Sequence, residues 1–158
     1  MEFPNLPTPE MTPILTFTLG EQYYALPIED VVEVAAMVEL VNLPNAVPGI
    51  LGIANRHGEV LPVLDLRLVL GGGNAPIDEW TLFVVVGREN RLIGLVVDAV
   101  RQVEYIPAAQ IYQSAASGKY IRGIISYRQR LIQLIDLLPL MTTYTAGVLT
   151  DNLAEVDA

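Results

Sequence analysis

Short apolar runs recur along most of the chain, and Gly, Asn or Pro bounds them. They are ILTFTLG, QYYALPI, GIANR, EVLPVLDL, TLFVVVG, RLIGLVVD, YIRGIIS and RLIQLID. Runs of this length, rich in Val, Ile, Leu and Tyr, are typical of β-strands. Apolar residues at consecutive positions indicate that many of these strands are packed on both faces. The links GEQ, HGE, GREN and RQR suit hairpin turns. The pattern predicts a mainly β protein with few, short helices.

An internal repeat organises these runs. The stretches GIANRHGEVLPVLDLR (52–67) and GIISYRQRLIQLIDLL (123–138) match without a gap. The segments upstream of them, 17–34 and 84–103, also correspond, with Val31 over Val100 and Val34 over Val103. A long repeat with only two copies is not a solenoid, which needs three or more units. It predicts two similar subdomains of about four to five strands each, packed as two small barrels.

Composition at the two ends predicts the domain boundaries. Residues 1–13 contain four prolines and predict an extended leader. Residues 146–158 combine small residues with three acids and predict a flexible acidic tail. The predicted domain covers 14–145, with subdomain 1 at about 14–70 and subdomain 2 at about 80–140. Some strands are expected to be exchanged between the two subdomains.

Helical content is predicted to be small. The segments PIEDVVEV and LVVDAVRQV are each expected to form one or two helical turns, with valines three residues apart on one face. Asp65 and Asp136 follow apolar runs and precede leucines, so each is expected to cap a short helix. Asp98 is expected to cap a strand end. The second copy carries about eight extra residues, expected within YQSAASGK (112–119).

Charge and composition exclude several classes of protein. The chain has 158 residues, 52% of them hydrophobic, no cysteine and a net charge of −9. All of that net charge falls in residues 1–79, where 11 acids face only Arg56 and Arg67. Nucleic-acid phosphates would be repelled, so nucleic-acid binding is not expected. No apolar run is long enough to span a bilayer, so direct membrane insertion is not expected either. The absence of cysteine fits a reducing cytoplasm.

The only histidine, His57, lies in the polar tetrad Asn55-Arg56-His57-Gly58 between two apolar runs. A catalytic or metal-binding role would need converging partners, for which Asp65 or Asp98 are the candidates. The sequence has no H-x-x-H, C-x-x-C or G-x-S-x-G pattern, so we predict no cofactor and no metal. LGGGN (70–74) lacks the Lys-Ser/Thr of a phosphate loop and predicts a linker. The other readings of the tetrad are a plain hairpin turn with Gly58 at positive φ, and an exposed recognition tip.

The two barrels are expected to meet at a cleft. Small barrels leave apolar edges, and a cleft lined by valines and a few polar groups would suit an amphipathic helix of a partner protein. Most of the valines that align between the copies are expected to be core residues.

Four blocks, in order, resemble the CheW family of chemotaxis coupling proteins. They are FTLGEQYYALPIEDVVEV, VPGILGIANRHGEVLPVLDLR, LIGLVVDAVRQV and YIRGIISYRQRLIQLID, which together span about residues 15–140. The resemblance implies two intertwined SH3-like five-stranded β-barrel subdomains. It implies a non-enzymatic, cytoplasmic adaptor that is recruited to membrane receptor arrays. Its partners would be the regulatory domain of a CheA-type histidine kinase and the helical tips of methyl-accepting chemoreceptors. One alternative is a related chemotaxis-like system controlling surface motility or another output. The other is a small ligand-binding barrel.

The same resemblance assigns candidate residues. A receptor-binding groove is implied at Val31, Glu33, Val34, Gly94 and Val103. A partner-binding turn is implied at Asn55, His57 and Gly58, and Gly52 is the candidate at the kinase interface. The family usually has arginine where this chain has His57, and arginine would be permanently charged. Arg56 is the neighbouring cation, but adjacent strand residues are expected to point to opposite faces.

Overall fold

The computed structural model describes residues 10–71, 76–113 and 118–145. The predicted acidic tail lies outside these residues. So do most of the predicted leader, most of the LGGGN linker and the middle of YQSAASGK. The first strand begins at Met11, so the last residues of the predicted leader already belong to the domain.

The described residues are mainly β, as predicted, with few and short helices. In chain order the elements are β1 (Met11–Leu19), β2 (Gln22–Pro27), the 3-10 turn η1 (Ile28–Asp30), β3 (Val31–Ala36), β4 (Ile50–Arg56), β5 (Glu59–Asp65), α1 (Leu66–Leu70), β6 (Leu82–Arg88), β7 (Arg91–Val97), β8 (Ala99–Pro107), the 3-10 turn η2 (Ala108–Gln110), β9 (Ile111–Tyr112), β10 (Ile121–Tyr127), β11 (Arg130–Ile135) and α2 (Leu137–Thr145).

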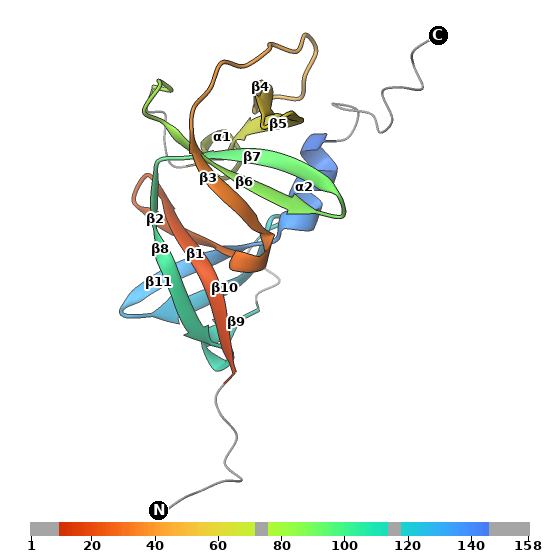
Figure 1. Ribbon diagram of the computed structural model, residues 1–158. Helices are drawn as coiled ribbons and strands as arrows, with labels where there is room; N and C mark the ends of the chain where they lie inside the picture. The colour runs from red at the N-terminus through yellow and green to blue at the C-terminus, as the bar shows by residue number, and fades with distance from the viewer. Residues whose placement is uncertain (1–9, 72–75, 114–117, 146–158) are drawn as a thin grey trace, which may run out of the picture.

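These strands form two sheets that exchange hairpins between the two sequence copies (Figure 1). Sheet A has the order β8-β1-β2-β11-β10-β9, and sheet B has the order β3-β6-β7-β5-β4. The first hairpin of each copy therefore joins the later strands of the other copy. The joins are two parallel pairs, β2 with β11 and β5 with β7. Sheet A has a sixth strand because the two residues of β9 pair with β10.

Alternation along each strand divides its side chains between two cores. On β6, Val84 and Val86 enter a large core shared by both sheets, whereas Phe83 and Val85 enter a second cluster formed by strands of sheet B. On β1, Phe17 enters the shared core and Ile14 enters a separate cluster of sheet A. Both faces of these strands are therefore buried, which explains their uninterrupted apolar runs.

Three hairpins turn through pairs of residues with positive φ. Positive φ at both central residues is the type I′ geometry, which matches the twist of two-residue hairpins. The pairs are His57 (53°) with Gly58 (83°), Glu89 (56°) with Asn90 (62°), and Arg128 (50°) with Gln129 (64°). The prediction of a hairpin turn at the tetrad, with Gly58 at positive φ, is confirmed.

The prediction of helical turns is confirmed in part for the first segment, where Ile28–Asp30 form η1, and is wrong for the second. Apart from η1, the first is the strand β3, and the second is the end of β7 followed by β8. Both segments are rich in valine, which favours strands. β3 pairs with β6, and β8 pairs with β1, so strand pairing outweighs the helical spacing of the valines. The alignment of the two sequence copies agrees with the pairing register of the strands. Val34 pairs with Val84 and Val103 with Leu15, at equivalent places in the two sheets.

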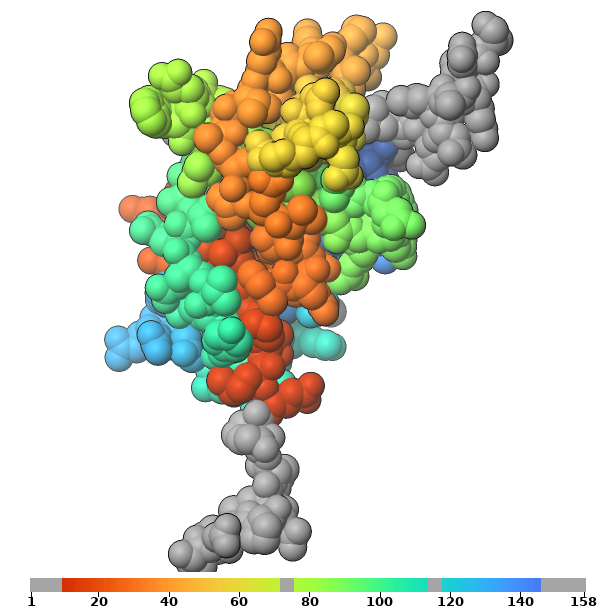
Figure 2. All heavy atoms as spheres, viewed as in Figure 1, coloured from red at the N-terminus to blue at the C-terminus, as the bar shows by residue number. Residues whose placement is uncertain are grey.

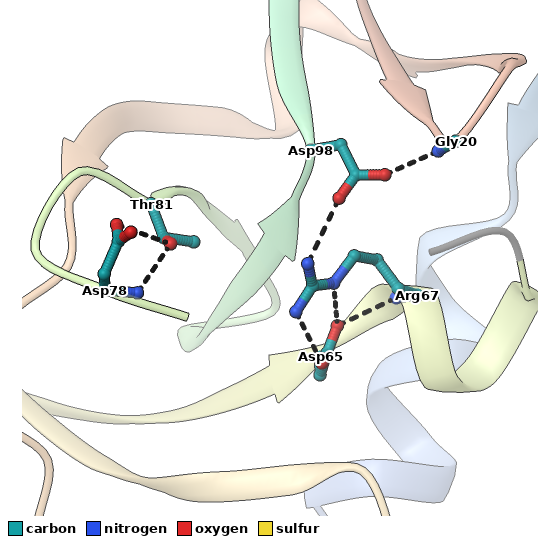
Figure 3. Close-up of polar contacts among 6 residues, drawn as sticks. All are labelled: Gly20, Asp65, Arg67, Asp78, Thr81 and Asp98. Atoms are coloured by element: carbon teal, nitrogen blue, oxygen red, sulfur yellow. Dashed lines mark hydrogen bonds and ion pairs between the residues drawn. The ribbon is translucent and has the colours of Figure 1, made fainter. Parts of the chain in front are cut away.

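A buried ion cluster ties the two sheets together at the end of β5 (Figure 3). Asp65 caps α1, as predicted, by accepting from the backbone N–H of Arg67 at 3.1 Å. The Arg67 guanidinium donates to Asp65 through Nε at 2.9 Å and to Asp98 Oδ1 at 3.2 Å. Asp98 Oδ2 in turn accepts from the N–H of Gly20, in the β1–β2 turn of sheet A, at 2.5 Å. We call this set the Asp65–Arg67–Asp98 clamp.

Replacing Arg67 with methionine should lower the free energy of unfolding by about 3–5 kcal/mol, because it leaves the buried Asp65 carboxylate without its cation. Arg67 is only 4% exposed, so little water can compensate. Urea denaturation measures the change. Arg91→Met is the matched control, since the Arg91 side chain is 43% exposed, and it should change stability by no more than about 0.5 kcal/mol. Equal effects of the two substitutions would contradict a structural role for the clamp.

Candidate functional site

The candidate site is built around Glu33 on β3. Arg56, the last residue of β4, forms a close ion pair with Glu33 Oε1 through Nη2. His57 Nε2 lies 3.5 Å from Glu33 Oε2 and 3.2 Å from Arg56 Nη2. The Arg56 guanidinium also lies over the ring of Phe83, 5.9 Å from its centroid. We call Glu33, Arg56 and His57 the Glu33 cluster.

Both side chains, Arg56 and His57, reach the same carboxylate because His57 is not a strand residue. Its φ of 53° turns the chain at the hairpin tip, so the alternation of a strand no longer applies. The expectation that Arg56 and His57 point to opposite faces is therefore wrong. Arg56 is the more enclosed, with its side chain 17% exposed, and His57 is 73% exposed. Arg56 supplies the permanent charge, and His57 presents its ring to solvent.

The Glu33 cluster bridges the two edges of sheet B. β3 and β4 lie at opposite ends of the strand order, yet their side chains Glu33 and Arg56 meet. Val41, in the loop after β3, also forms a β-bridge with Ile53 of β4. Contacts between first and last strands require the sheet to curl, which is consistent with a small barrel.

Sheet A carries a related pair that sequence reasoning missed. Glu104 of edge strand β8 accepts from Arg130 Nη2 at 3.4 Å, and the Arg130 guanidinium lies 4.7 Å from the centroid of the Tyr23 ring. The Glu104 side chain is only 4% exposed. A charged residue beside a hairpin turn is ordinarily solvated, but the Arg130 side chain is only 29% exposed. No local pattern links it to Glu104, because the two are 26 residues apart.

Electrostatics favour an ionised Glu33. The hydrogen bond from Arg56 is the main cause that lowers the pKa of the Glu33 carboxyl below its ordinary value of 4.5, against a smaller opposing effect of burial. The charges of Arg56 and His57 act in the same direction. The cluster therefore holds a fixed carboxylate between a permanent cation and an exposed imidazole.

The candidate groove residues lie on two edge strands and in one interior position. Val31 packs against the shared core, and Val34 on the same strand is 40% exposed. Val103 is 46% exposed on β8, the edge strand of the other sheet. Figure 2 shows β3 (orange) and β8 (green) on one face of the molecule. Gly94 is buried in β7, where an added Cβ would lie 2.8 Å from Phe83 Cδ2, so close packing explains this glycine.

The remaining candidates also divide into exposed residues and one buried glycine. Asn55 and Gly58 are exposed beside His57 on the β4–β5 hairpin. Gly52 is buried in β4, and a Cβ there would lie 2.6 Å from the carbonyl oxygen of Val41. The close approach of Val41 to β4 therefore accounts for Gly52. It is a packing requirement of the curled sheet, behind the exposed turn.

His57 does not contact Asp65 or Asp98 in the structure. Both carboxylates belong to the Asp65–Arg67–Asp98 clamp, whereas His57 contacts Glu33 and Arg56. Among the described residues, no group of three or more His, Cys, Asp or Glu side chains is placed to hold a metal ion. No helix in the described part of the chain is both long and apolar enough to cross a membrane.

Comparison with known proteins identifies the family. Residues 13–144 match the family model described as the CheW-like domain. The chain belongs to the CheW family. A chemotaxis protein CheW from Klebsiella aerogenes is 29% identical over 146 residues, covering 89% of this chain and 87% of that protein. Protein FrzA from Myxococcus xanthus is 32% identical over 133 residues, covering 80% and 83%.

A solved structure agrees with this assignment. The crystal structure of the scaffolding protein TtCheW from Thermoanaerobacter tengcongensis matches with a TM-score of 0.74 and 29% identity, covering 80% of this chain and 89% of that one. The expected family and the mainly β fold are confirmed, and the two sheets are consistent with the two expected barrel subdomains. As a CheW-family member, the chain is a scaffold protein of chemotaxis signalling.

Replacing Glu33 with glutamine should destabilise the fold at neutral pH and have less effect in acid. Because Arg56 lowers the folded-state pKa of Glu33, the contribution of its carboxylate is complete above pH 4.5. That contribution is lost as the pH falls through the lowered pKa. Urea denaturation at about pH 7 and at about pH 3 measures the difference between the native chain and Glu33→Gln.

The control for this comparison is Glu39→Gln, on an exposed residue of the loop after β3. It should leave the free energy of unfolding nearly unchanged at both pH values. A Glu33→Gln effect of the same size in acid and at neutral pH would contradict the ion pair with Arg56.

Proposed function

We propose that this chain is a non-enzymatic adaptor that couples chemoreceptor tips to a CheA-type histidine kinase. The CheW-family match over residues 13–144 carries the proposal, because it covers both sheets and both edge strands. The adaptor would act in the cytoplasm and be recruited to receptor arrays in the membrane. Its contribution to signalling would be geometric: it holds two partners at a fixed distance and orientation.

The receptor would bind along the edge strands β3 and β8. Val32 and Val34 are 57% and 40% exposed on β3, and Val103 and Tyr105 are 46% and 60% exposed on β8. Exposed apolar side chains on one face mark an interaction surface, and an amphipathic helix binds such a surface through its apolar face. Val31, Glu33, Val34 and Val103 would form this contact. Gly94 would act only by allowing β7 to pack closely beneath it.

The kinase regulatory domain would bind at the β4–β5 hairpin. Asn55, His57 and Gly58 form its exposed tip, and the Glu33 cluster holds the tip on a rigid sheet. Recognition groups that are fixed before binding lose little conformational entropy on association. Gly52 would support this interface indirectly, by keeping β4 close to Val41.

A pull-down with a CheA-type regulatory domain and with a receptor signalling tip tests this function. The native chain should bind both. Val34→Asp should weaken the receptor arm selectively, because it buries an unpaired charge against an apolar helix face. Binding to neither partner would overturn the proposal. The second candidate is the same coupling in a chemotaxis-like system that controls surface motility or another output; the relatives include FrzA as well as proteins named CheW.

His57→Arg should leave the fold intact and change affinity for the partner at the hairpin tip. The side chain is 73% exposed, so the substitution should shift stability by no more than about 0.5 kcal/mol. It would place a second permanent cation beside Glu33 and add a planar set of donors. Asn90→Arg is the matched control, because it adds a charge at the turn of the β6–β7 hairpin. Unchanged affinity for every partner would contradict a recognition role for the tip.

A further inference from the structure

A small pocket lies beside the Asp65–Arg67–Asp98 clamp, next to the segment that precedes β6. Its volume is about 180 Å³, and it is lined by Arg67, Pro76, Asp78, Trp80, Thr81, Val97 and Asp98. This volume is below the range of about 300–1,000 Å³ found for sites of drug-sized ligands. The pocket has room for one side chain or a group of similar size. None of its lining residues belongs to the Glu33 cluster or to the exposed face of β3 and β8.

Trp80 forms one side of this pocket, and it is 80% exposed. It is also the only tryptophan of the chain. Tryptophan is among the residues that contribute most binding energy at protein interfaces. An indole this exposed adds little buried apolar area to the folded protein. The segment that carries it protrudes at the upper left of Figures 1 and 2.

The segment is held in one conformation by its own hydrogen bonds. Asp78 Oδ1 accepts from the N–H of Trp80 at 2.8 Å, and Thr81 Oγ1 accepts from the N–H of Asp78 at 2.9 Å. The backbone N–H of Thr81 also donates to the carbonyl of Asp78, at 3.1 Å. Figure 3 shows Asp78 and Thr81 across from the clamp. The backbone that carries Trp80 and the Asp78 carboxylate are therefore held in place before any ligand binds.

The charge around the pocket is negative. The guanidinium of Arg67 is already divided between Asp65 and Asp98. Within the part of the chain that the structure describes, Asp78 accepts only from neutral donors, the N–H of Trp80 and the hydroxyl of Thr81. The pocket lining holds one cation, Arg67, and two carboxylates, Asp78 and Asp98, so its net charge is negative. An anion or a neutral apolar group would leave that excess unbalanced. A cation would be attracted both by the carboxylates and by the face of the Trp80 indole, the best aromatic partner for a cation.

We propose that this pocket binds a single basic side chain, arginine or lysine, of a partner protein. The cationic head would lie against the Trp80 ring near Asp78, and the aliphatic stem would follow Pro76 and Val97. The site would give the adaptor a third contact, separate from the receptor face and from the hairpin tip. The inference is independent of which kinase or receptor the chain serves.

The single tryptophan makes the test direct. Fluorescence of Trp80 is followed while N-acetyl-arginine-N-methylamide or its lysine counterpart is added at low ionic strength. The expected result is a saturable change that weakens with added salt, because a partly exposed ion contact is screened. The corresponding citrulline compound has the same shape without the charge and should give no saturable change.

Two variants distinguish binding in the pocket from a general attraction of cations to the acidic segment. Asp78→Asn keeps the oxygen that accepts from Trp80 and should weaken arginine binding about two- to fivefold, the size expected for one partly exposed charge pair. Glu79→Gln removes one charge from the same segment, outside the pocket lining, and should weaken binding less than twofold. Circular dichroism checks that both variants fold.

Three results would overturn the proposal: no saturable change with either cation, equal binding of citrulline, or equal weakening by both variants. If Asp78→Asn does not fold, the comparison of arginine with citrulline on the native chain decides alone. A failed pull-down with the kinase and the receptor would refute the proposed function and leave this result unaffected.

Discussion

The exchange of hairpins between the two sequence copies is the constraint on which the rest of the structure depends. Sheet A takes β1 and β2 from the first copy, and sheet B takes β6 and β7 from the second. The parallel pairs β2–β11 and β5–β7 complete the sheets, so neither copy can satisfy its backbone hydrogen bonds alone. The shared core and the Asp65–Arg67–Asp98 clamp then hold the two sheets in one relative position. An adaptor that sets the distance between partners requires such rigidity.

The residues that connect the edges of the sheets also support the surfaces that we propose for partner recognition. Glu33 and Arg56 connect the two edge strands of sheet B, and they also anchor the hairpin tip that carries His57. Glu104 and Arg130 form a related contact in sheet A. The edge strands β3 and β8 keep exposed valines on the face that we assign to the receptor. Unpaired strand edges invite association, and we propose that this property serves receptor binding here.

Several elements follow from local chemistry that the sequence displays directly. The apolar runs identify most of the strands, and the links between them identify the type I′ turns. The position of Asp65 before a leucine run identifies a helix cap. β3 and β8 were misjudged because short valine-rich segments fit either a helical turn or a strand, and only the available partner strand decides. Residue spacing likewise could not show that Arg56 and His57 share Glu33, since the left-handed φ of His57 determines where its ring points.

The class of fold, the two-copy organisation and the family can be read from the residues alone, because these depend on periodicity and on the order of blocks along the chain. Which residues meet follows from tertiary packing. Arg67 and Asp98 are 31 residues apart, Gly20 and Asp98 are 78 apart, and the Trp80 pocket combines α1, the segment before β6 and the end of β7. Contacts of this kind arise from hairpin exchange and sheet curvature. Those are properties of the whole packed chain, and no local pattern encodes them.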